Sequence, residues 1–122
     1  MAIGTTTLAA ALGGKVYSDT AASNSVVAAA SGATTIYHVE FDNTANSAVT
    51  YLKFYESGSV TLGTTQPSFV LKAAAATKEY LSFPTGLSHA SALQYIATTT
   101  ASNASGSPAA PSTACGLTIL YS

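Results

Sequence analysis

The sequence predicts an all-β protein, an antiparallel β-sandwich of the jelly-roll or immunoglobulin-like type with about eight strands. Short bursts of β-branched and aromatic residues are separated by Gly, Ser, Asn and Pro along most of the 122 residues, a pattern typical of sandwiches and barrels. Helix signals are weak, because the one Ala-rich run, Leu71 to Tyr80, has neither an N-cap nor an apolar stripe. A chain of this length is expected to form one domain.

The expected strands follow from these bursts and from the turn residues between them. They are Lys15–Ser18, Ser25–Ala29, Thr34–Asp42, Ala48–Glu56, Ser68–Leu71, Lys78–Ser82, Ala92–Thr98 and Gly116–Tyr121. Alternation in the third strand puts Tyr37, Val39 and Phe41 on one face, which is the expected core face. The polar segment 42–48 supplies Asp and Asn for a turn, so the strands before and after it are predicted to form a hairpin. Pro84 and Gly86 predict a further turn.

The domain organisation is expected to consist of an arm and a sandwich. Residues 1–14 are weakly patterned and, fully extended, would reach roughly 45 Å, far enough to lie on a neighbouring subunit. Residues 15–122 form the single sandwich domain. Within it, residues 98–114 are low in complexity and without hydrophobic period, which predicts a long exposed loop.

The strand Ala48–Glu56 carries large side chains on both faces. Leu52 and Phe54 are expected to fill the core. Tyr51, Lys53 and Tyr55 would then lie on an outer face that is covered by the arm or by a neighbouring subunit, although the reverse parity fits the pattern as well. The residues predicted to lie in an interface are therefore Ile3, Leu8, Leu12, Tyr51, Lys53 and Tyr55.

Charge is scarce, since only 7% of residues are Asp, Glu, Lys or Arg and the net charge is −1, against about 25% charged residues in an average soluble domain. Arg is absent and the four lysines do not cluster, so neither a nucleic acid nor an anionic membrane is an expected partner. No run approaches the roughly 20 apolar residues that span a membrane. The apolar patch of residues 8–12 is too short for a secretory signal and lacks a positive n-region. A nearly neutral Ser/Thr/Ala surface favours contact with further copies of the chain.

Residues that could carry chemistry are few. His38 and Glu40 share one strand face, as a metal half-site or a general-base pair would require, but both side chains pointing to solvent or an interface explains the spacing better. His89 has no acidic neighbour in sequence and is expected in a loop or interface. Cys115 is the lone cysteine and is expected to be a small buried hydrophobe rather than a nucleophile.

Other sites are also weakly indicated. Asp42, Asn43 and Asn46 offer oxygens to a calcium ion, yet a turn accounts for them equally well. No G-x-S-x-G, G-x-G-x-x-G or P-loop motif is present. The sequence therefore predicts no enzyme, no catalytic residue, no metal and no cofactor.

The segment from Phe41 to Ala101 resembles a family of small tailed-bacteriophage proteins. In that family a strand rich in aromatic residues precedes a V-G-T-x-x-P stretch, an F-P-x-G-L turn and a strand that ends in Thr. The matching residues are Val49, Tyr51, Leu52, Lys53, Phe54 and Tyr55, then Val60, Gly63, Thr64 and Pro67, then Phe83, Gly86 and Leu87, and finally Tyr95 to Thr98. The closing strand, residues 116–122, is similar too.

The resemblance implies a β-sandwich virion component without catalytic residues. The leading expectation is a capsid decoration or cement protein at the virion surface, with the major capsid protein and further copies of itself, as a dimer or trimer, for partners. A tail or head fibre knob that binds a host glycan is the alternative, with Tyr95 as an aromatic platform. A small hydrolase using His38 and Glu40 and a carbohydrate-binding module are further alternatives, although the chain has no Trp for the latter.

Overall fold

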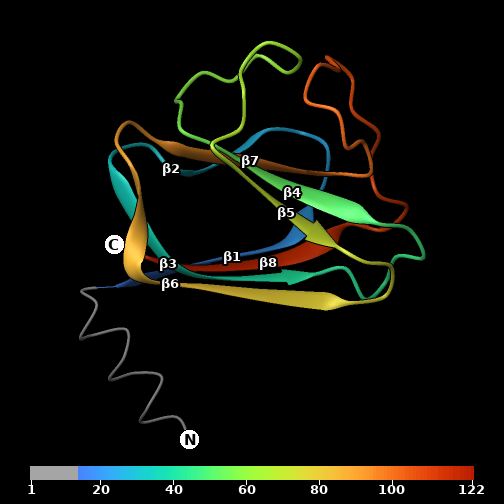
Figure 1. Cartoon of the computed structure of the whole chain (residues 1–122), viewed down its shortest axis with the longest axis horizontal. Helices are drawn as coiled ribbons and strands as arrows, with labels where there is room; N and C mark the ends of the chain where they lie inside the picture. The colour runs from blue at the N-terminus through green and yellow to red at the C-terminus, as the bar shows by residue number, and fades with distance from the viewer. Residues whose placement is uncertain (1–13) are drawn as a thin grey trace, which may run out of the picture.

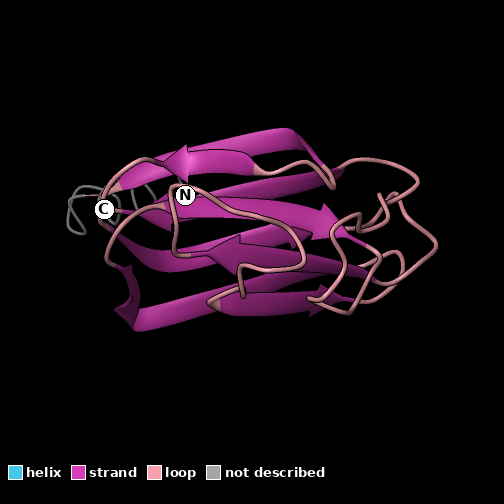
Figure 2. Ribbon diagram, turned by 90° about the horizontal axis from the view of Figure 1, so that it is seen from above, coloured by secondary structure: helices cyan, strands magenta, loops and turns pink. Residues whose placement is uncertain are grey.

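The structure, a computed structural model, describes residues 14–122, and within this range the chain forms two four-stranded antiparallel sheets that pack face to face (Figure 1). Figure 2 shows the strands running side by side along the longest axis. The strands are β1 (Lys15–Ala22), β2 (Val27–Ala30), β3 (Thr34–Asp42), β4 (Thr50–Tyr55), β5 (Phe69–Ala73), β6 (Lys78–His89), β7 (Leu93–Thr98) and β8 (Cys115–Tyr121). The predicted all-β sandwich is confirmed, and each expected strand overlaps an observed one.

The strand order identifies the type of sandwich. The first sheet runs β1-β8-β3-β6 and the second runs β2-β7-β4-β5; we call them the β1 sheet and the β4 sheet. The pairs β1 with β8, β2 with β7, β3 with β6 and β4 with β5 are those of one long hairpin rolled up into two layers. This is the jelly-roll arrangement, so the jelly-roll form of the prediction describes the fold.

The core lies between the two sheets and is built from side chains that alternate along each strand. Leu52 and Phe54 on β4 face Val39 and Phe41 on β3, and all four are fully buried. Burying each such side chain contributes about 1.5–3 kcal/mol relative to exposure. The prediction that Leu52 and Phe54 fill the core is confirmed.

The predicted hairpin between β3 and β4 is wrong, because these strands belong to different sheets. The turn residues between them form a corner that carries the chain from one layer to the other. Asn43 is fully buried and its Nδ2 donates to the carbonyls of Ala48 and Ala74, at 3.0 Å each. Asn46 binds the backbone of Thr113 through both its amide nitrogen and its amide oxygen, at 2.8 Å each. A local turn is present as well, because Asp42 Oδ1 accepts from Thr44 and the Asn46 N–H donates to the Asn43 carbonyl. The contacts with Ala74 and Thr113 join this corner to distant segments of the chain.

The predicted core face of β3 is correct for its second half and wrong for its first half. Ile36 is fully buried, whereas Tyr37, expected in the core, is only partly buried. Between Ile36 and His38 the chain advances by two residues while its neighbour β8 advances by one. This bulge reverses the alternation, so that Val39 and Phe41 point inward on the far side of it.

The turn predicted at Pro84 and Gly86 is instead an irregularity inside the long strand β6. Four residues of β6 lie opposite Tyr37 alone, between the pairs Ile36 with Leu87 and His38 with Ser82. Gly86 has φ +82°, and a Cβ there would clash with the methyl group of the Thr35 side chain. Pro84 lacks an N–H and is tolerated because this stretch leaves the regular ladder.

Candidate functional site

The outer face of the β4 sheet is nearly as dry as the core. Lys53 is 1% exposed and Tyr55 is 3% exposed, and Ile96, paired with Lys53 from β7, is also buried. Tyr51 is half-buried. Of the two orientations considered for β4, the one with Leu52 and Phe54 in the core is therefore observed, and Tyr51, Lys53 and Tyr55 lie on the outer face.

The covering of this face comes from the chain itself. Lys53 Nζ donates to the carbonyls of Ala101 and Ser102, at 3.2 and 2.8 Å. These residues belong to the loop between β7 and β8, which lies beside the loop between β4 and β5 over this sheet (Figure 1). The two loops touch at Gly63. A Cβ added to this glycine would lie only 2.9 Å from the backbone nitrogen of Gly106.

The β7–β8 loop is held by its own hydrogen bonds as well. Thr98 Oγ1 and the Thr99 N–H both donate to the Ala109 carbonyl, and the Ala109 N–H donates to Thr100 Oγ1. Many of its side chains are exposed, but Pro108 and Pro111 are buried. The loop expected to be exposed thus serves to close one face of the sandwich.

Burial changes the electrostatics of the closed face. Desolvation lowers the pKa of Lys53 below its ordinary range, since the charged ammonium is disfavoured away from water. The same cause raises the pKa of Tyr55. Lys53 reaches carbonyl groups and no carboxylate among the described residues, so its charge is held by loop backbone dipoles.

These contacts bear on the predicted interface. The chain itself covers Lys53 and Tyr55. Of the three β4 residues predicted to lie in an interface, Tyr51 therefore keeps the most accessible surface. Ile3, Leu8 and Leu12 lie outside the described residues, and their proposed contacts with a partner stay a prediction.

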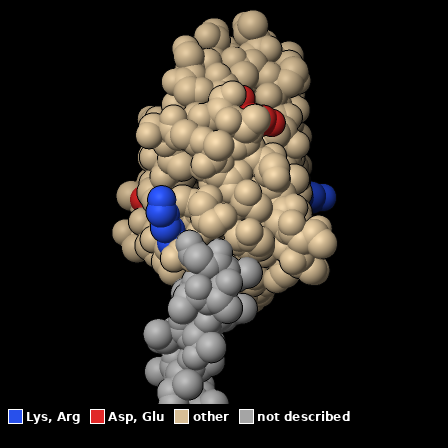
Figure 3. All heavy atoms as spheres, turned by 90° about the vertical axis from the view of Figure 1, so that its left-hand side faces the viewer, with Lys and Arg blue, Asp and Glu red and all other residues tan. Residues whose placement is uncertain are grey.

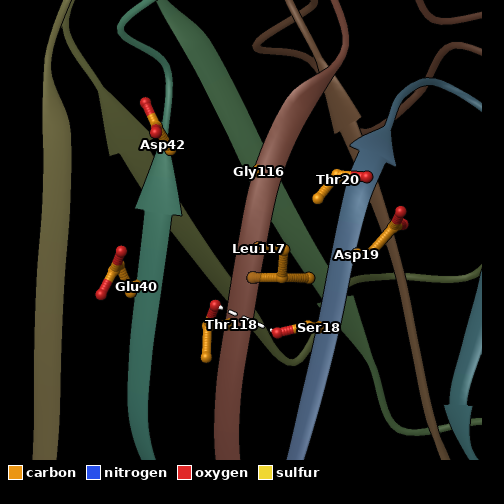
Figure 4. A pocket seen from close by; sticks show the side chains of 8 residues that line it. All are labelled: Ser18, Asp19, Thr20, Glu40, Asp42, Gly116, Leu117 and Thr118. Atoms are coloured by element: carbon orange, nitrogen blue, oxygen red, sulfur yellow. Dashed lines mark hydrogen bonds between the residues drawn. The ribbon is translucent and has the colours of Figure 1, made fainter.

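Within residues 14–122, the outer face of the β1 sheet is open, in contrast to that of the β4 sheet. It carries the two most exposed large apolar side chains of the described chain, Val16 at 62% and Tyr80 at 60%. An open hollow of about 140 Å³ crosses this face, lined mainly by small polar and acidic residues (Figure 4). Gly116 pairs with Asp42 and has no side chain, so this part of the face is shallow.

Charge on the open face is largely compensated within it. Lys78 Nζ lies 3.1 Å from Glu40 and 3.7 Å from Asp42. Its hydrogen bond with Glu40 raises the pKa of Lys78, and hydrogen bonds from Thr44 lower the pKa of Asp42. Figure 3 shows how few charged side chains one end of the molecule presents.

The predicted pair of His38 and Glu40 does not act as a unit. His38 Nδ1 hydrogen-bonds to Ser82 at 2.9 Å, while Glu40 pairs with Lys78. Within residues 14–122, no three His, Cys, Asp or Glu side chains gather closely enough to hold a metal ion. Asn43 and Asn46, weighed as calcium ligands, direct their amides into the corner instead.

Two buried polar clusters carry no signal in the local sequence. Tyr95 is fully buried and its hydroxyl bonds both Asp19 and Tyr17, which lie on β1, more than 70 residues away. His89, expected in a loop or interface, is 1% exposed at the end of β6, with Nε2 at 2.7 Å from Ser68 Oγ. Only the folded topology reveals these contacts, because their partners lie on distant strands.

Cys115 is buried, and desolvation raises its pKa to about 11. The thiol is therefore protonated at neutral pH and inert as a nucleophile. The prediction of a small buried hydrophobe is confirmed.

No helix long and apolar enough to cross a membrane occurs in the described part of the chain. No protein-family model matches the chain, and no curated protein matches its sequence. Among solved structures, one described as "Bacillus endospore appendages form a novel family of disulfide-linked pili" is similar at 12% identity, with a TM-score of 0.44, over 88% of this chain and 80% of that chain.

A structure of infectious bursal disease virus, Gx strain, is similar at 10% identity, with a TM-score of 0.32. It covers 88% of this chain and 32% of that chain, so the present chain spans about a third of the viral one. Both identities and both TM-scores are low, and neither likeness assigns a function to this chain.

Proposed function

We propose that this protein is a non-enzymatic structural component of a virion, a capsid decoration protein that binds and stabilises the shell of the major capsid protein as a homo-oligomer. The observation that carries the proposal is the contrast between its two broad faces. The chain's own loops close the β4 sheet, whereas the β1 sheet presents an open and nearly neutral surface. The resemblance of residues 41–101 to small tailed-bacteriophage proteins supports the same class.

The open face suits a broad protein surface better than a small ligand. Its hollow of about 140 Å³ is smaller than the roughly 300–1,000 Å³ of sites for drug-sized molecules. Val16 and Tyr80 supply exposed apolar contact area, and Tyr is enriched among the residues that dominate binding energy. Lys78 already pairs with Glu40 and Asp42, so a partner that covers this face buries paired and not isolated charges, which lowers the desolvation penalty without removing it.

Binding to shells that lack the protein tests the proposal. Purified full-length protein is expected to bind such shells at a repeated position visible by electron microscopy, and to raise their disruption temperature. Tyr80→Ala is expected to weaken binding roughly 10-fold or more through loss of an exposed aromatic contact. Val70→Ala, which removes the exposed apolar side chain on the outer face of the β4 sheet, is the matched control and should bind as the wild type does.

Two results would contradict the proposal. One is that the wild-type protein does not bind shells at any concentration tested, and the other is that V70A weakens binding while Y80A does not. Deletion of residues 2–13 in the same assay tests the proposed contribution of Ile3, Leu8 and Leu12.

The residue on which the alternative of a glycan-binding knob depends is not accessible to a ligand. Tyr95, expected as an aromatic platform beside the β7–β8 loop, is fully buried between the sheets. Its ring packs edge-on against Tyr17, with ring centroids 5.8 Å apart, and is not available for stacking on a sugar.

A further inference from the structure

The two sheets end in four edge strands, and three of them are poorly suited to further pairing. In the β4 sheet the edges are β2, which has four residues and a register shift, and β5, which has five residues. In the β1 sheet, β6 contains Pro84 and the irregular stretch around Gly86. Short edges, prolines and bulges are the means by which proteins prevent strand addition.

The fourth edge, β1, lacks these features over most of its length. It spans Lys15 to Ala22 without Pro or Gly, and its pairing with β8 is regular from Lys15 to Asp19. Its second edge has no strand partner within residues 14–122, and such an edge presents unpaired backbone donors and acceptors. Val16 and Ser18, on the open outer face, are both exposed.

Two charges on β1 lack ionic partners in the described chain. Lys15 and Asp19 lie four residues apart and on the same side of the strand, and the salt bridges within residues 14–122 involve Lys78 instead. Lys15 Nζ lies 6.0 Å from the centroid of the Tyr121 ring. The Asp19 carboxylate accepts from Ala21 N and from Tyr95, which leaves further acceptor positions open.

We propose that β1 is a self-association edge, at which β1 of a second copy adds antiparallel about a two-fold axis at Tyr17. The two β1 sheets then form one continuous eight-stranded sheet across the dimer. In this register Lys15 lies opposite Asp19 of the partner subunit, and the symmetry repeats the pair. Val16 lies opposite Ser18 of the partner subunit on the outer face.

The charge pattern selects this register from its neighbours. In a two-fold antiparallel pair, side chains that lie directly opposite each other must be on the same face of the sheet. The axis must therefore pass through a residue, and neighbouring registers differ by moving the axis by one residue. With the axis at Tyr17, two opposite charges face each other twice, whereas an axis at Ser18 places Lys15 opposite Ala21 of the partner subunit. Opposite charges in directly opposed positions stabilise antiparallel pairs.

The net charge of −1 adds little repulsion between the copies. The pairing supplies the interface of the homo-oligomer in the proposed function and in that respect rests on it. It is tested on the isolated protein without any shell, so the two proposals are distinguishable. A dimer that does not bind shells contradicts the proposed shell binding and leaves this inference intact. A monomer that binds shells contradicts this inference and the homo-oligomer of the proposed function, and leaves the proposed shell binding intact.

Disulfide cross-linking between two single-cysteine variants tests the register. V16C and S18C each add one exposed thiol, while native Cys115 is buried and does not compete. An equal mixture of the two full-length variants under mild oxidation is expected to cross-link up to about half of the protein, the share of mixed dimers, because directly opposed Cβ atoms lie within reach of a disulfide. Each variant alone is expected to cross-link far less, since its cysteines are then offset. Y80C, on the opposite edge of the same sheet, is the matched control and should not cross-link.

Lys15→Glu tests the charge pairing. It replaces two attractive pairs with two repulsive ones and is expected to weaken dimerisation roughly 10-fold at low salt, with the difference disappearing at about 0.5 M NaCl. Sedimentation measures the dimer, and thermal unfolding confirms that K15E is folded.

Several results would overturn the inference. They are a wild-type protein that is monomeric at about 100 µM, cross-linking of S18C alone as strongly as the mixture, and a K15E dimer as tight as the wild type at low salt. A full chain that is monomeric while a variant lacking residues 2–13 dimerises would show that the N-terminal segment occupies the edge instead.

Discussion

Lys53 shows how the surroundings of one side chain decide its role. It lies on a strand between two tyrosines, and it is 1% exposed with its ammonium group on two loop carbonyls. Its aliphatic stem covers apolar surface while its charged end holds the loop. The same residue that suggested an interface in the sequence therefore closes the β4 sheet from within.

The lowered pKa of Lys53 gives a pH dependence with a definite sign. A lysine whose pKa is lower in the folded than in the unfolded state binds fewer protons when folded, within the interval between the two values. The free energy of unfolding therefore rises with pH in that interval, up to the ordinary lysine value of 10.5. We expect the wild type to gain stability relative to Lys53→Met as the pH rises toward 10.5.

Urea unfolding of both proteins across this range measures the difference, and effects of other titrating groups cancel in it. Lys72→Met, which removes an exposed lysine of β5, is the control and should show no such trend. A difference between the wild type and K53M that does not change with pH would contradict the assignment.

Gly63 is a second position where one residue controls the closed face. Its φ of +85° disfavours any side chain, and a Cβ would meet the backbone of residues 104–106 at 2.9–3.1 Å. Gly63→Ala is therefore expected to destabilise the protein by about 1–3 kcal/mol. Gly58→Ala, in the same loop, would place its Cβ 3.9 Å from the nearest neighbouring atom, Ala92 Cβ, which is an ordinary contact.

Chemical denaturation compares the two alanine variants. G58A should stay within about 0.5 kcal/mol of the wild type, as surface substitutions usually do. Equal effects of G63A and G58A would show that the two loops are not packed as described.

At the scale of the elements, the corner between β3 and β4 decides which strands become neighbours. Asn43 and Asn46 satisfy their amide groups with backbone of the corner itself, at Ala48, and of two distant segments, at Ala74 and Thr113. Buried amides are costly when unpaired and direct the fold when paired. Because these contacts hold the corner open, β4 continues into the second sheet and does not return along β3.

Asn46→Ala is expected to lower the free energy of unfolding by about 2–4 kcal/mol, since it leaves the Thr113 backbone and Ser112 without their partners. Ser47→Ala, at the exposed neighbouring position, is the control and should have an effect below about 0.5 kcal/mol. Thermal or urea unfolding measures both. A small effect of N46A would mean that the corner is fixed by the strands and not by its amides.

The sequence was sufficient to predict the strands but not their pairing. Alternation and turn residues are local signals, and they placed all eight strands and the core role of Leu52 and Phe54. The pairing of β3 with β8 and the corner contacts of Asn46 with Thr113 join residues 67 or more positions apart, which local patterns do not encode. The bulge at Tyr37 escaped prediction for a related reason, because it is defined only against a neighbouring strand.

The candidate site was predictable to a similar degree. The large side chains on both faces of β4 predicted that both faces are buried. The loop that covers the outer face was not predicted, because the Ser, Thr and Ala residues of this loop make their contacts mainly through backbone groups. A loop whose carbonyls receive a lysine has the same composition as a loop exposed to solvent.

For the whole molecule, scarcity of charge determines how it responds to salt. The salt bridges within residues 14–122 are the exposed contacts of Lys78 with Glu40 and Asp42. Exposed pairs contribute little and are screened. The stability of the sandwich therefore depends on burial and hydrogen bonds.

We expect the free energy of unfolding to change by less than about 0.5 kcal/mol between roughly 0.02 and 0.3 M NaCl. Urea unfolding at several salt concentrations checks this, with Lys78→Ala as the variant that removes the exposed pairs. A change of several kcal/mol would point to an ionic contribution that the described residues do not contain.

The place of β8 in the β1 sheet has a consequence for biosynthesis. β8 lies between β1 and β3, so within residues 14–122 neither β1 nor the facing edge of β3 has a strand partner until β8 has been synthesised. The sheet is thus completed only after residues 115–121 leave the ribosome, and until then β1 and one edge of β3 remain unpaired in the nascent chain. Long-range pairing of this kind slows folding and exposes aggregation-prone edges, so the time between synthesis and closure by β8 is the period in which this chain most needs protection by chaperones.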